Sequence, residues 1–181
     1  PALMLSFEPM PREFLQPDSP PARLTNFRER WRLLQRSGLD ALCLLRFDAR
    51  LRAMRGHEFV GLLYETLRPE ALVAGYDFRF GRQGEASAGL LVSEGRRLGF
   101  SVEVIAPVLE GAARVSSSAV REALSRGDLA QAEAQLGRPY SIRGRVVAGE
   151  RLGRQLGYPT ANLRLERRRS PLGGIFAVRV H

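Results

Sequence analysis

The feature that most constrains the fold is a change of pattern at Gly137-Arg138-Pro139. Before it, short apolar segments alternate with amphipathic segments of helical period, which is typical of an α/β unit with a parallel sheet. From Tyr140 on, polar and apolar side chains alternate and glycines recur, which indicates strands. The length of 181 residues allows one domain or two small ones. We therefore expect an α/β domain at residues 1–138 and the start of a β domain at residues 139–181.

Within the first domain, the expected elements alternate between strand and helix. The expected strands are Ala2–Phe7, Leu39–Phe47, Ala71–Ala74 and Phe100–Ala106. The expected helices are Asn26–Ser37, Ala49–Met54, His57–Leu67, Ala86–Leu98, Ser116–Ser125 and a last one from Asp128 to Leu136. A proline-rich loop leads to Thr25, which we expect to cap the first helix. In the second domain, Ile175–Val180 predicts a further strand.

Charge leaves one competing interpretation open. The chain carries 28 basic and 19 acidic residues, for a net charge of +9, and every basic residue is an arginine. Such a balance is compatible with a basic nucleic-acid-binding module. The arginines are scattered, however, as on a solvated surface, and the triplet Arg167–Arg169 predicts a solvated loop. Because no basic strand or helix is studded with aromatic residues, we do not expect nucleic acid as a partner.

Neither a membrane nor an oxidising compartment is indicated. Apolar runs such as Ala41–Leu45 are far shorter than the roughly 20 residues of a transmembrane helix. The single cysteine, Cys43, allows no internal disulfide. We expect a cytoplasmic protein with no membrane partner. With 2 histidines and no Cys-x-x-Cys, a zinc site or a histidine-based triad is disfavoured.

The first candidate site is the loop Gly75–Gly81. It follows a predicted strand, at the carboxyl edge where open α/β sheets bind ligands. Phe78 and Phe80 can stack on a flat ring, and Asp77 can accept a hydrogen bond from one. An ordinary glycine-bounded loop with core aromatic residues would have the same composition, so both interpretations stay open.

Two further segments could hold phosphate. Serines 116–118 at a helix start present hydroxyl and N–H groups to an anion, and Arg121 can reach the same anion. Plain N-capping is the alternative. From Gly149 to Asn162, glycines allow backbone amides to approach a phosphate closely, and the side chains of Thr160 and Asn162 offer oxygens that suit Mg²⁺. A glycine-rich hairpin and turn is the alternative there.

In their order along the chain, these segments resemble the prokaryotic bifunctional riboflavin kinase/FAD synthetase family. Ser6-Phe7-Glu8-Pro9-Met10-Pro11 looks like the family's Thr-Phe-Glu-Pro-His-Pro segment, and Gly75–Gly81 looks like its flavin loop. Val115–Arg121 looks like its Ser-Ser-Thr-x-x-Arg motif, and Gly137-Arg138-Pro139-Tyr140 looks like the joint between its two domains. Gly157-Tyr158-Pro159-Thr160-Ala161-Asn162 contains its Pro-Thr-Ala-Asn signature. The last is the most specific, because such a four-residue identity rarely arises by chance.

The resemblance implies a multifunctional transferase of FAD biosynthesis. A C-terminal β-barrel kinase would transfer the γ-phosphoryl group of ATP to riboflavin, which gives FMN. A Rossmann-like nucleotidyltransferase domain would then transfer AMP from a second ATP to FMN, which gives FAD and pyrophosphate. Both steps would use Mg²⁺. The implied partners are flavin and ATP substrates, and the chemistry would be positioning and charge neutralisation of phosphates.

The resemblance assigns binding residues but no catalytic residue. Those implied for the flavin pocket of the adenylyltransferase are Asp77, Phe78 and Phe80. Those implied for its ATP phosphates are Ser117, Ser118 and Arg121. Those implied for ATP in the kinase are Gly149, Gly153, Gly157, Thr160 and Asn162, of which Thr160 and Asn162 would also bind the metal.

Both ends of the chain depart from the family pattern. The family's first strand and its histidine-containing nucleotide motif should precede Pro1, and the rest of the kinase barrel should follow His181. We therefore expect an internal piece of a longer protein that is impaired on its own in both reactions. A nucleotidyltransferase with a decayed kinase is an alternative, against which the intact Pro-Thr-Ala-Asn signature argues. Met10 and Ser118, which replace a histidine and a threonine, are mild departures.

Overall fold

The computed structural model describes residues 1–149, 157–158 and 160–180. The chain divides into two compact units, each built from separate stretches. Unit 1 comprises Pro1–Leu3, Pro21–Ala41 and Glu110–His181, and unit 2 comprises Met4–Pro20 and Leu42–Leu109. Chain order and compact units therefore do not coincide, and the domain boundary expected near residue 138 stays a prediction.

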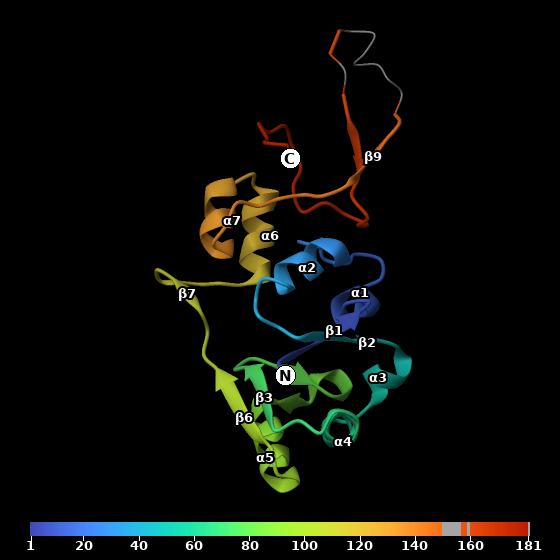
Figure 1. Cartoon of the computed structure of the whole chain (residues 1–181), viewed down its shortest axis with the longest axis vertical. Helices are drawn as coiled ribbons and strands as arrows, with labels where there is room; N and C mark the ends of the chain where they lie inside the picture. The colour runs from blue at the N-terminus through green and yellow to red at the C-terminus, as the bar shows by residue number, and fades with distance from the viewer. Residues whose placement is uncertain (150–156, 159, 181) are drawn as a thin grey trace. The chain divides into compact units, whose positions relative to one another are not determined.

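Unit 2 is a mixed α/β unit (Figure 1). Its elements are most of β1 (Leu3–Glu8) and β2 (Ala41–Arg46), with α1 (Pro11–Leu15), α3 (Ala49–Ala53), α4 (Gly56–Leu67), β3 (Ala71–Gly75), β4 (Arg79–Phe80), β5 (Ala86–Ser87), α5 (Ala88–Leu98) and β6 (Ser101–Ile105). Strand β1 pairs with β2, and β3 pairs in parallel with β6, with Ala71 opposite Ser101. Helices between parallel strands confirm the α/β class expected for this part.

The core of unit 2 lies where α4 and α5 cover the strands. Phe59, Val60 and Leu63 recur at helical spacing on α4, so they face one side of the helix and are buried there. They pack with Leu91 of α5 and with Phe100 in one apolar cluster. The apolar period of these segments is therefore sufficient to place their helices.

Two local expectations are wrong in unit 2. The proline-rich segment is not a loop throughout, because α1 forms at Pro11–Leu15. Proline is favourable at the start of a helix, where its missing N–H would have no intrahelical partner. The helix expected from Ala86 begins at Ala88 instead, because Ala86 and Ser87 pair with β4 as strand β5.

The helices of unit 1 all lie before residue 137, and its described elements after that residue are strands. Its elements are α2 (Phe27–Leu34), β8 (Ala113–Arg114), which pairs with β7 (Leu109–Glu110), α6 (Ser117–Ser125), α7 (Leu129–Leu136), β9 (Arg145–Val147) and β10 (Asn162–Arg164). Helices α6 and α7 pack on each other through Val120, Ala123, Leu124 and Ala132. Strands β9 and β10 are antiparallel, with Leu163 opposite Val146. Among the described residues, no helix is both long and apolar enough to cross a membrane.

Two expectations are also wrong in unit 1. Asn26 rather than Thr25 caps α2, because Asn26 Oδ1 accepts from Glu29 N at 2.9 Å and Glu29 Oε2 accepts from Asn26 N at 2.7 Å.

The strand expected at Ile175–Val180 does not form in the described structure, where Ile175 and Val178 are exposed. An apolar segment becomes a strand only where a partner supplies the ladder of hydrogen bonds.

The expectation that Arg167–Arg169 form a solvated loop is wrong for Arg167. The side chain of Arg167 is 0% exposed, and its Nη2 donates to Glu29 Oε2 at 2.5 Å. Its Nη1 donates to the Tyr140 hydroxyl at 3.1 Å. A guanidinium presents several donors in a fixed fork, so one side chain serves several acceptors. Arg168 and Arg169 are exposed, as expected.

Helix α4 offers a matched pair of glycines that tests its packing. A Cβ at Gly56 would lie 2.5 Å from Ala86 Cβ and 2.8 Å from Leu90 Cδ2, whereas a Cβ at Gly61 would meet nothing within 4 Å. We expect Gly56→Ala to lower the free energy of unfolding by about 1–3 kcal/mol through overpacking. Gly61→Ala should raise it by up to about 1 kcal/mol, because alanine favours the helix. Urea unfolding measures both, and equal effects would contradict the packing of α4.

Candidate functional site

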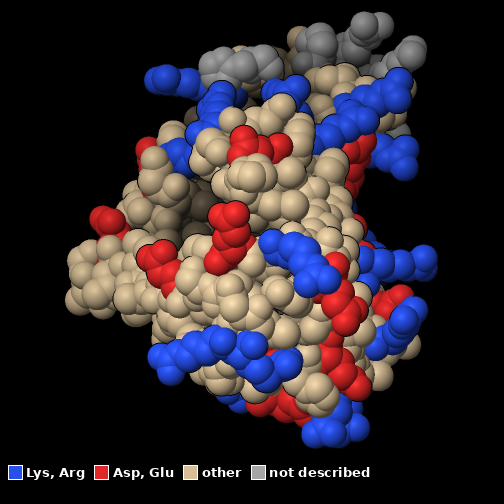
Figure 2. All heavy atoms as spheres, turned by 60° about the horizontal axis from the view of Figure 1, so that its bottom comes forward, with Lys and Arg blue, Asp and Glu red and all other residues tan. Residues whose placement is uncertain are grey.

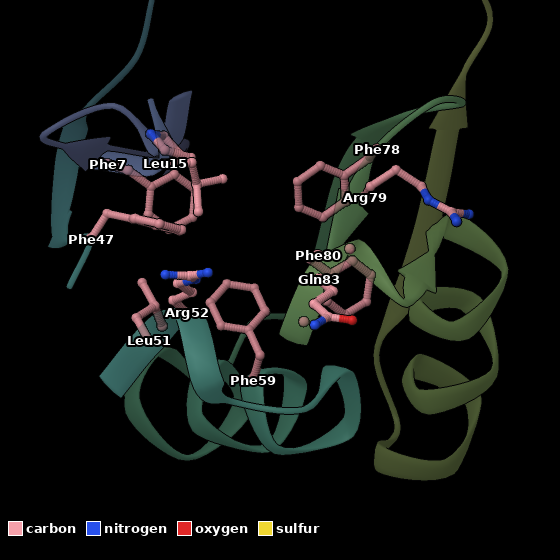
Figure 3. A pocket seen from close by; sticks show the side chains of 13 residues that line it. Phe7, Leu15, Phe47, Leu51, Arg52, Phe59, Phe78, Arg79, Phe80 and Gln83 are labelled. Atoms are coloured by element: carbon pink, nitrogen blue, oxygen red, sulfur yellow. The ribbon is translucent and has the colours of Figure 1, made fainter. Parts of the chain in front are cut away.

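A cavity of about 370 Å³ lies within unit 2 (Figure 3). It is lined by Phe7, Pro11, Leu15, Phe47, Leu51, Arg52, Phe59, Phe78, Arg79, Phe80, Gly81, Gln83 and Gly84. Ligand cavities are typically lined by apolar and aromatic side chains with a few polar groups. This lining is of that kind, and it favours a ligand with a flat apolar part.

Two segments that are far apart in the sequence meet at this cavity. Phe7 lies near the end of β1, and Pro11 begins α1. Phe78 follows the turn after β3, which is closed by a hydrogen bond from Phe78 N to Gly75 O at 3.0 Å. Segment 6–11 and loop 75–81, which the sequence singled out separately, therefore line one cavity.

Aromatic rings stand on both sides of the cavity. Phe78 and Phe80 stack with ring centroids 5.2 Å apart and planes 20° apart. Phe80 is buried and also contacts Phe59 at 5.8 Å, so it supports Phe78 from behind. Phe7 and Phe47 meet edge to face at 5.9 Å. In Figure 3 these two rings face Phe78 across the cavity.

Arg52 and Gln83 give the cavity polar character, and sequence reasoning identified neither. Arg52 projects from α3 toward the cavity in Figure 3, whereas Arg79 points away from it. Gln83 follows Gly81 in the turn that packs against α3. No sequence signal marks either residue, because the packing of α3 on this turn decides which side chains reach the cavity.

Gly81 allows this turn to approach α4. Its φ is +75°, and a Cβ there would lie 2.7 Å from Gly56 N. Only glycine combines a positive φ with so close an approach of two backbones. Gly56 N in turn donates to Glu85 Oε1 at 3.1 Å, which ties the start of α4 to the end of the turn.

Asp77 lies at the same turn but is not among the residues that line the cavity. It is exposed in the turn between β3 and β4. Tyr76 N donates to Ile105 O at 3.0 Å, which fixes the turn to the end of β6. Of the residues expected for a flat ligand, Phe78 and Phe80 thus line the cavity, and the role of Asp77 stays a prediction.

The second candidate site begins α6, in unit 1. Ser116 Oγ accepts from Ala119 N at 3.1 Å, so Ser116 is the N-cap. Ser117 and Ser118 occupy the first helical positions and are exposed. Arg121 is half-buried on the same helix, and its Nε donates to Ala22 O at 2.6 Å. Ser117, Ser118 and Arg121, which we expect to hold phosphate, therefore lie at the same end of one helix. The hydrogen bond to the backbone carbonyl of Ala22 holds the Arg121 side chain in place.

The third candidate site lies at β9 and β10. Asn162 stands opposite Val147, and its side chain fills the space beside Gly149, where a Cβ would meet Asn162 Nδ2. Gly157 has a φ of +81°, and Thr160 is exposed. Gly153 lies outside the described residues. The structure thus brings Gly149 and Asn162 together.

The described part of the chain contains no group of three or more His, Cys, Asp or Glu side chains that could hold a metal ion. Thr160 and Asn162 offer a hydroxyl and an amide oxygen, which is the kind of donor that Mg²⁺ accepts. Mg²⁺ usually completes its coordination with water and substrate phosphates. The residues present therefore fit a magnesium ion that arrives with a phosphate ligand.

On one face of the molecule, the surface charge is mixed in sign. On the face that Figure 2 shows, arginine side chains are interspersed with acidic ones. A protein that tracks a nucleic-acid backbone gathers its positive charge in a groove or stripe.

Two family models match the chain. The model described as FAD synthetase matches residues 1–119, and the model described as riboflavin kinase matches residues 136–181. The cavity in unit 2 lies within the first match, and β9 and β10 lie within the second.

Several curated relatives share the name bifunctional riboflavin kinase/FMN adenylyltransferase, which states both activities. The protein of Escherichia coli K12 is 44% identical over 181 residues, which is 99% of this chain and 58% of the relative. The protein of Pseudomonas fluorescens is 42% identical, again over 99% of this chain and 58% of the relative. The chain thus spans a little over half the length of these relatives.

A solved structure is similar along almost the whole chain. It is described as a macrolide-efflux protein from Streptococcus pneumoniae, with a TM-score of 0.81 and 32% identity over 96% of this chain and 57% of that one. The FAD synthetase model covers more than half of the residues, and the riboflavin kinase model matches residues that follow it in this chain. The chain therefore belongs to the family of bifunctional riboflavin kinases/FMN adenylyltransferases.

Proposed function

We propose that the complete gene product that contains this chain converts riboflavin to FMN and FMN to FAD. The observation that supports this most strongly is the aromatic cavity of unit 2, where segment 6–11 and loop 75–81 meet within the FAD synthetase match. We propose further that the pairs β1–β2 and β3–β6 belong to a Rossmann-like sheet, and that β9 and β10 belong to the kinase barrel. A reaction that consumes ATP in both steps is expected in the cytoplasm.

In this proposal the cavity holds the flavin of FMN. Its volume of about 370 Å³ lies within the range of small-molecule sites. The flat ring system would lie against Phe78, with Phe80 as the support behind it. Asp77, at the same turn, would accept a hydrogen bond from the ring. Arg52 would pair with the FMN phosphate, because a guanidinium binds such an anion with two parallel hydrogen bonds.

ATP for adenylyl transfer would bind at the start of α6. The first-turn N–H groups and the helix dipole favour an anion there, and Ser117, Ser118 and Arg121 add hydroxyl and guanidinium donors. In the reaction, an oxygen of the FMN phosphate attacks the α-phosphorus of ATP, and the bond to the bridging oxygen breaks to release pyrophosphate. These residues position the phosphates and neutralise their charge, which is the main contribution of a protein to such a step.

The kinase reaction would use the β9–β10 region. Gly149, Gly153 and Gly157 would let the backbone approach the nucleotide phosphates. The riboflavin 5′-hydroxyl would attack the γ-phosphorus and release its proton to water, while the bond from the γ-phosphorus to the bridging oxygen breaks and ADP leaves. Thr160 and Asn162 would hold Mg²⁺, which when bound neutralises the charge of the transferred group. The packing of Asn162 beside Gly149 supports a common site for these residues.

Turnover by the complete gene product tests this proposal. With riboflavin and Mg–ATP, it should form FMN and FAD, which chromatography separates. Thr160→Val should lower FMN formation about 100-fold or more, because an oxygen donor at the transferred phosphoryl group is lost. FAD formation from added FMN should be unchanged in that variant, since the phosphates of adenylyl transfer are assigned to Ser117, Ser118 and Arg121.

The matched control is Thr66→Val, an exposed threonine on α4, which should alter neither reaction. A complete gene product that converts no flavin would overturn the proposed function. Equal losses of both reactions in Thr160→Val would contradict the role given to Thr160.

The cavity is tested by kinetics of FAD formation. Phe78→Ala should raise the KM for FMN about tenfold, since stacking of a flat base on an aromatic ring contributes about 1–3 kcal/mol. Arg52→Met should raise the KM for FMN but leave the inhibition constant of riboflavin unchanged, because riboflavin has no phosphate for Arg52 to bind.

Arg50→Met is the control for Arg52, since both arginines are exposed on α3 and Arg50 does not line the cavity. It should change neither constant. If Arg52→Met weakens FMN and riboflavin equally, Arg52 does not bind the phosphate. If Phe78→Ala leaves the KM for FMN unchanged, the flavin lies elsewhere.

A further inference from the structure

The carbonyl groups of residues 22–24, here called loop 22–24, are contacted from two sides. Arg121 Nε donates to Ala22 O at 2.6 Å. Arg167 Nη1 lies 3.2 Å from Arg23 O and 3.3 Å from Leu24 O, and donates to both. All these groups belong to unit 1. One short loop therefore accepts hydrogen bonds from Arg121 of α6 and from an arginine of the riboflavin kinase match.

The position of Arg167 is strongly determined. Its side chain has no exposed surface, and that of its partner Glu29 is 9% exposed. A buried charge is costly unless it is paired, so Arg167 must stay where the Glu29 carboxylate lies. Glu29 is itself fixed, because Oε1 accepts from Arg143 N at 2.6 Å and Oε2 from Asn26 N at 2.7 Å. Arg167 thus holds loop 22–24 from a rigid point.

Tyr140 holds the same loop. Its hydroxyl accepts from Arg167 Nη1 at 3.1 Å and donates to Leu24 O at 3.1 Å. Burial raises the pKa of this hydroxyl, and the charge of Arg167 offsets part of the increase. The hydroxyl therefore remains protonated and can donate to Leu24 O. Like Arg167, Tyr140 belongs to the riboflavin kinase match.

Loop 22–24 lies outside the described helices and strands, so side chains from elsewhere decide where its carbonyl groups lie. The hydrogen bond from Nε to Ala22 O fixes the plane of the Arg121 guanidinium and hence the direction of its remaining donors. A small displacement of Ala22 would rotate those donors away from a bound phosphate. The effect on catalysis would be large, since an error of about 1 Å in positioning can cost about 100-fold in rate.

We propose that Arg167 is a positioning residue for adenylyl transfer, which acts through loop 22–24 on the guanidinium of Arg121. This inference rests on the role proposed above for Arg121. It assigns to a residue of the riboflavin kinase match a part in the other reaction of the protein. Adenylyl transfer then depends on a correctly docked kinase region, even though that region contributes no group to the AMP transfer itself.

The experiment measures KM for ATP and kcat in FAD formation from added FMN, on the complete gene product. Arg167→Met should raise the KM for ATP about tenfold. Arg167→Lys should fold, because it keeps a charge for Glu29, and should still raise the KM, because one ammonium cannot serve all the acceptors of the guanidinium. Arg168→Met is the matched control, an exposed neighbour that should leave the KM unchanged.

Combination with Arg121→Met separates the inference from the proposed function. Arg121→Met should itself raise the KM for ATP, and Arg167→Met should then add nothing, because both act through one group. If Arg121→Met leaves the KM unchanged, the role proposed for Arg121 fails, and the inference fails with it.

The remaining outcomes concern the inference alone. In one such outcome, Arg121→Met raises the KM for ATP while both Arg167 variants leave it unchanged. In another, the effects of Arg121→Met and Arg167→Met on the KM for ATP multiply in the double variant. In either case Arg167 does not act through Arg121, and the proposed function stands. If both Arg167 variants lower kcat of FMN and FAD formation by the same factor and leave the KM for ATP unchanged, Arg167 is a structural residue and the inference is overturned.

Discussion

The guanidinium of Arg167 is fully buried, and unit 1 is arranged around the need to pair it. Glu29 neutralises the charge from the start of α2, and loop 22–24 and Tyr140 accept the other hydrogen bonds. Removal of one partner from such a buried pair typically costs about 3–5 kcal/mol, because the other charge is left unpaired. The extended segment after β10, the start of α2 and the chain around Tyr140 are therefore held together by one electrostatic requirement.

Unit 2 depends on a different constraint, which is the close approach of backbone at Gly81 and Gly56. There the turn after β4 lies against the start of α4, and Phe80 is buried at the same place. This support fixes Phe78 at the edge of the cavity. The proposed flavin site is thus a consequence of core packing, since the rings that support a ligand are continuous with the apolar cluster under α4.

Local patterns predicted the elements whose stability is local. The apolar period of α4 and the capping residues Ser116 and Asp128 identify their helices from sequence, because a helix satisfies its own backbone hydrogen bonds. The Ile175–Val180 segment shows the opposite case, since a strand needs a neighbour that the segment itself does not specify. The resemblance identified the segments around Phe7 and Phe78, but only the fold places them at one cavity.

Long-range partners explain what the sequence could not predict. Arg167 stands in a run of arginines that is typical of solvent, and its partner Glu29 is 138 residues away in the chain. Nothing near Arg167 indicates that its charge is buried. Arg52 is equally inconspicuous, because α3 carries two arginines and only the packed structure selects the one that lines the cavity.

The most direct test of this account is the coupling between Arg167 and Glu29. The free energy of unfolding is measured for Arg167→Met, Glu29→Gln and the double variant. If the pair holds unit 1 together, the effects will be non-additive by about 1.5 kcal/mol or more, as expected for residues in one buried network. Effects that add to within about 0.5 kcal/mol would contradict it, since independent sites behave in that way.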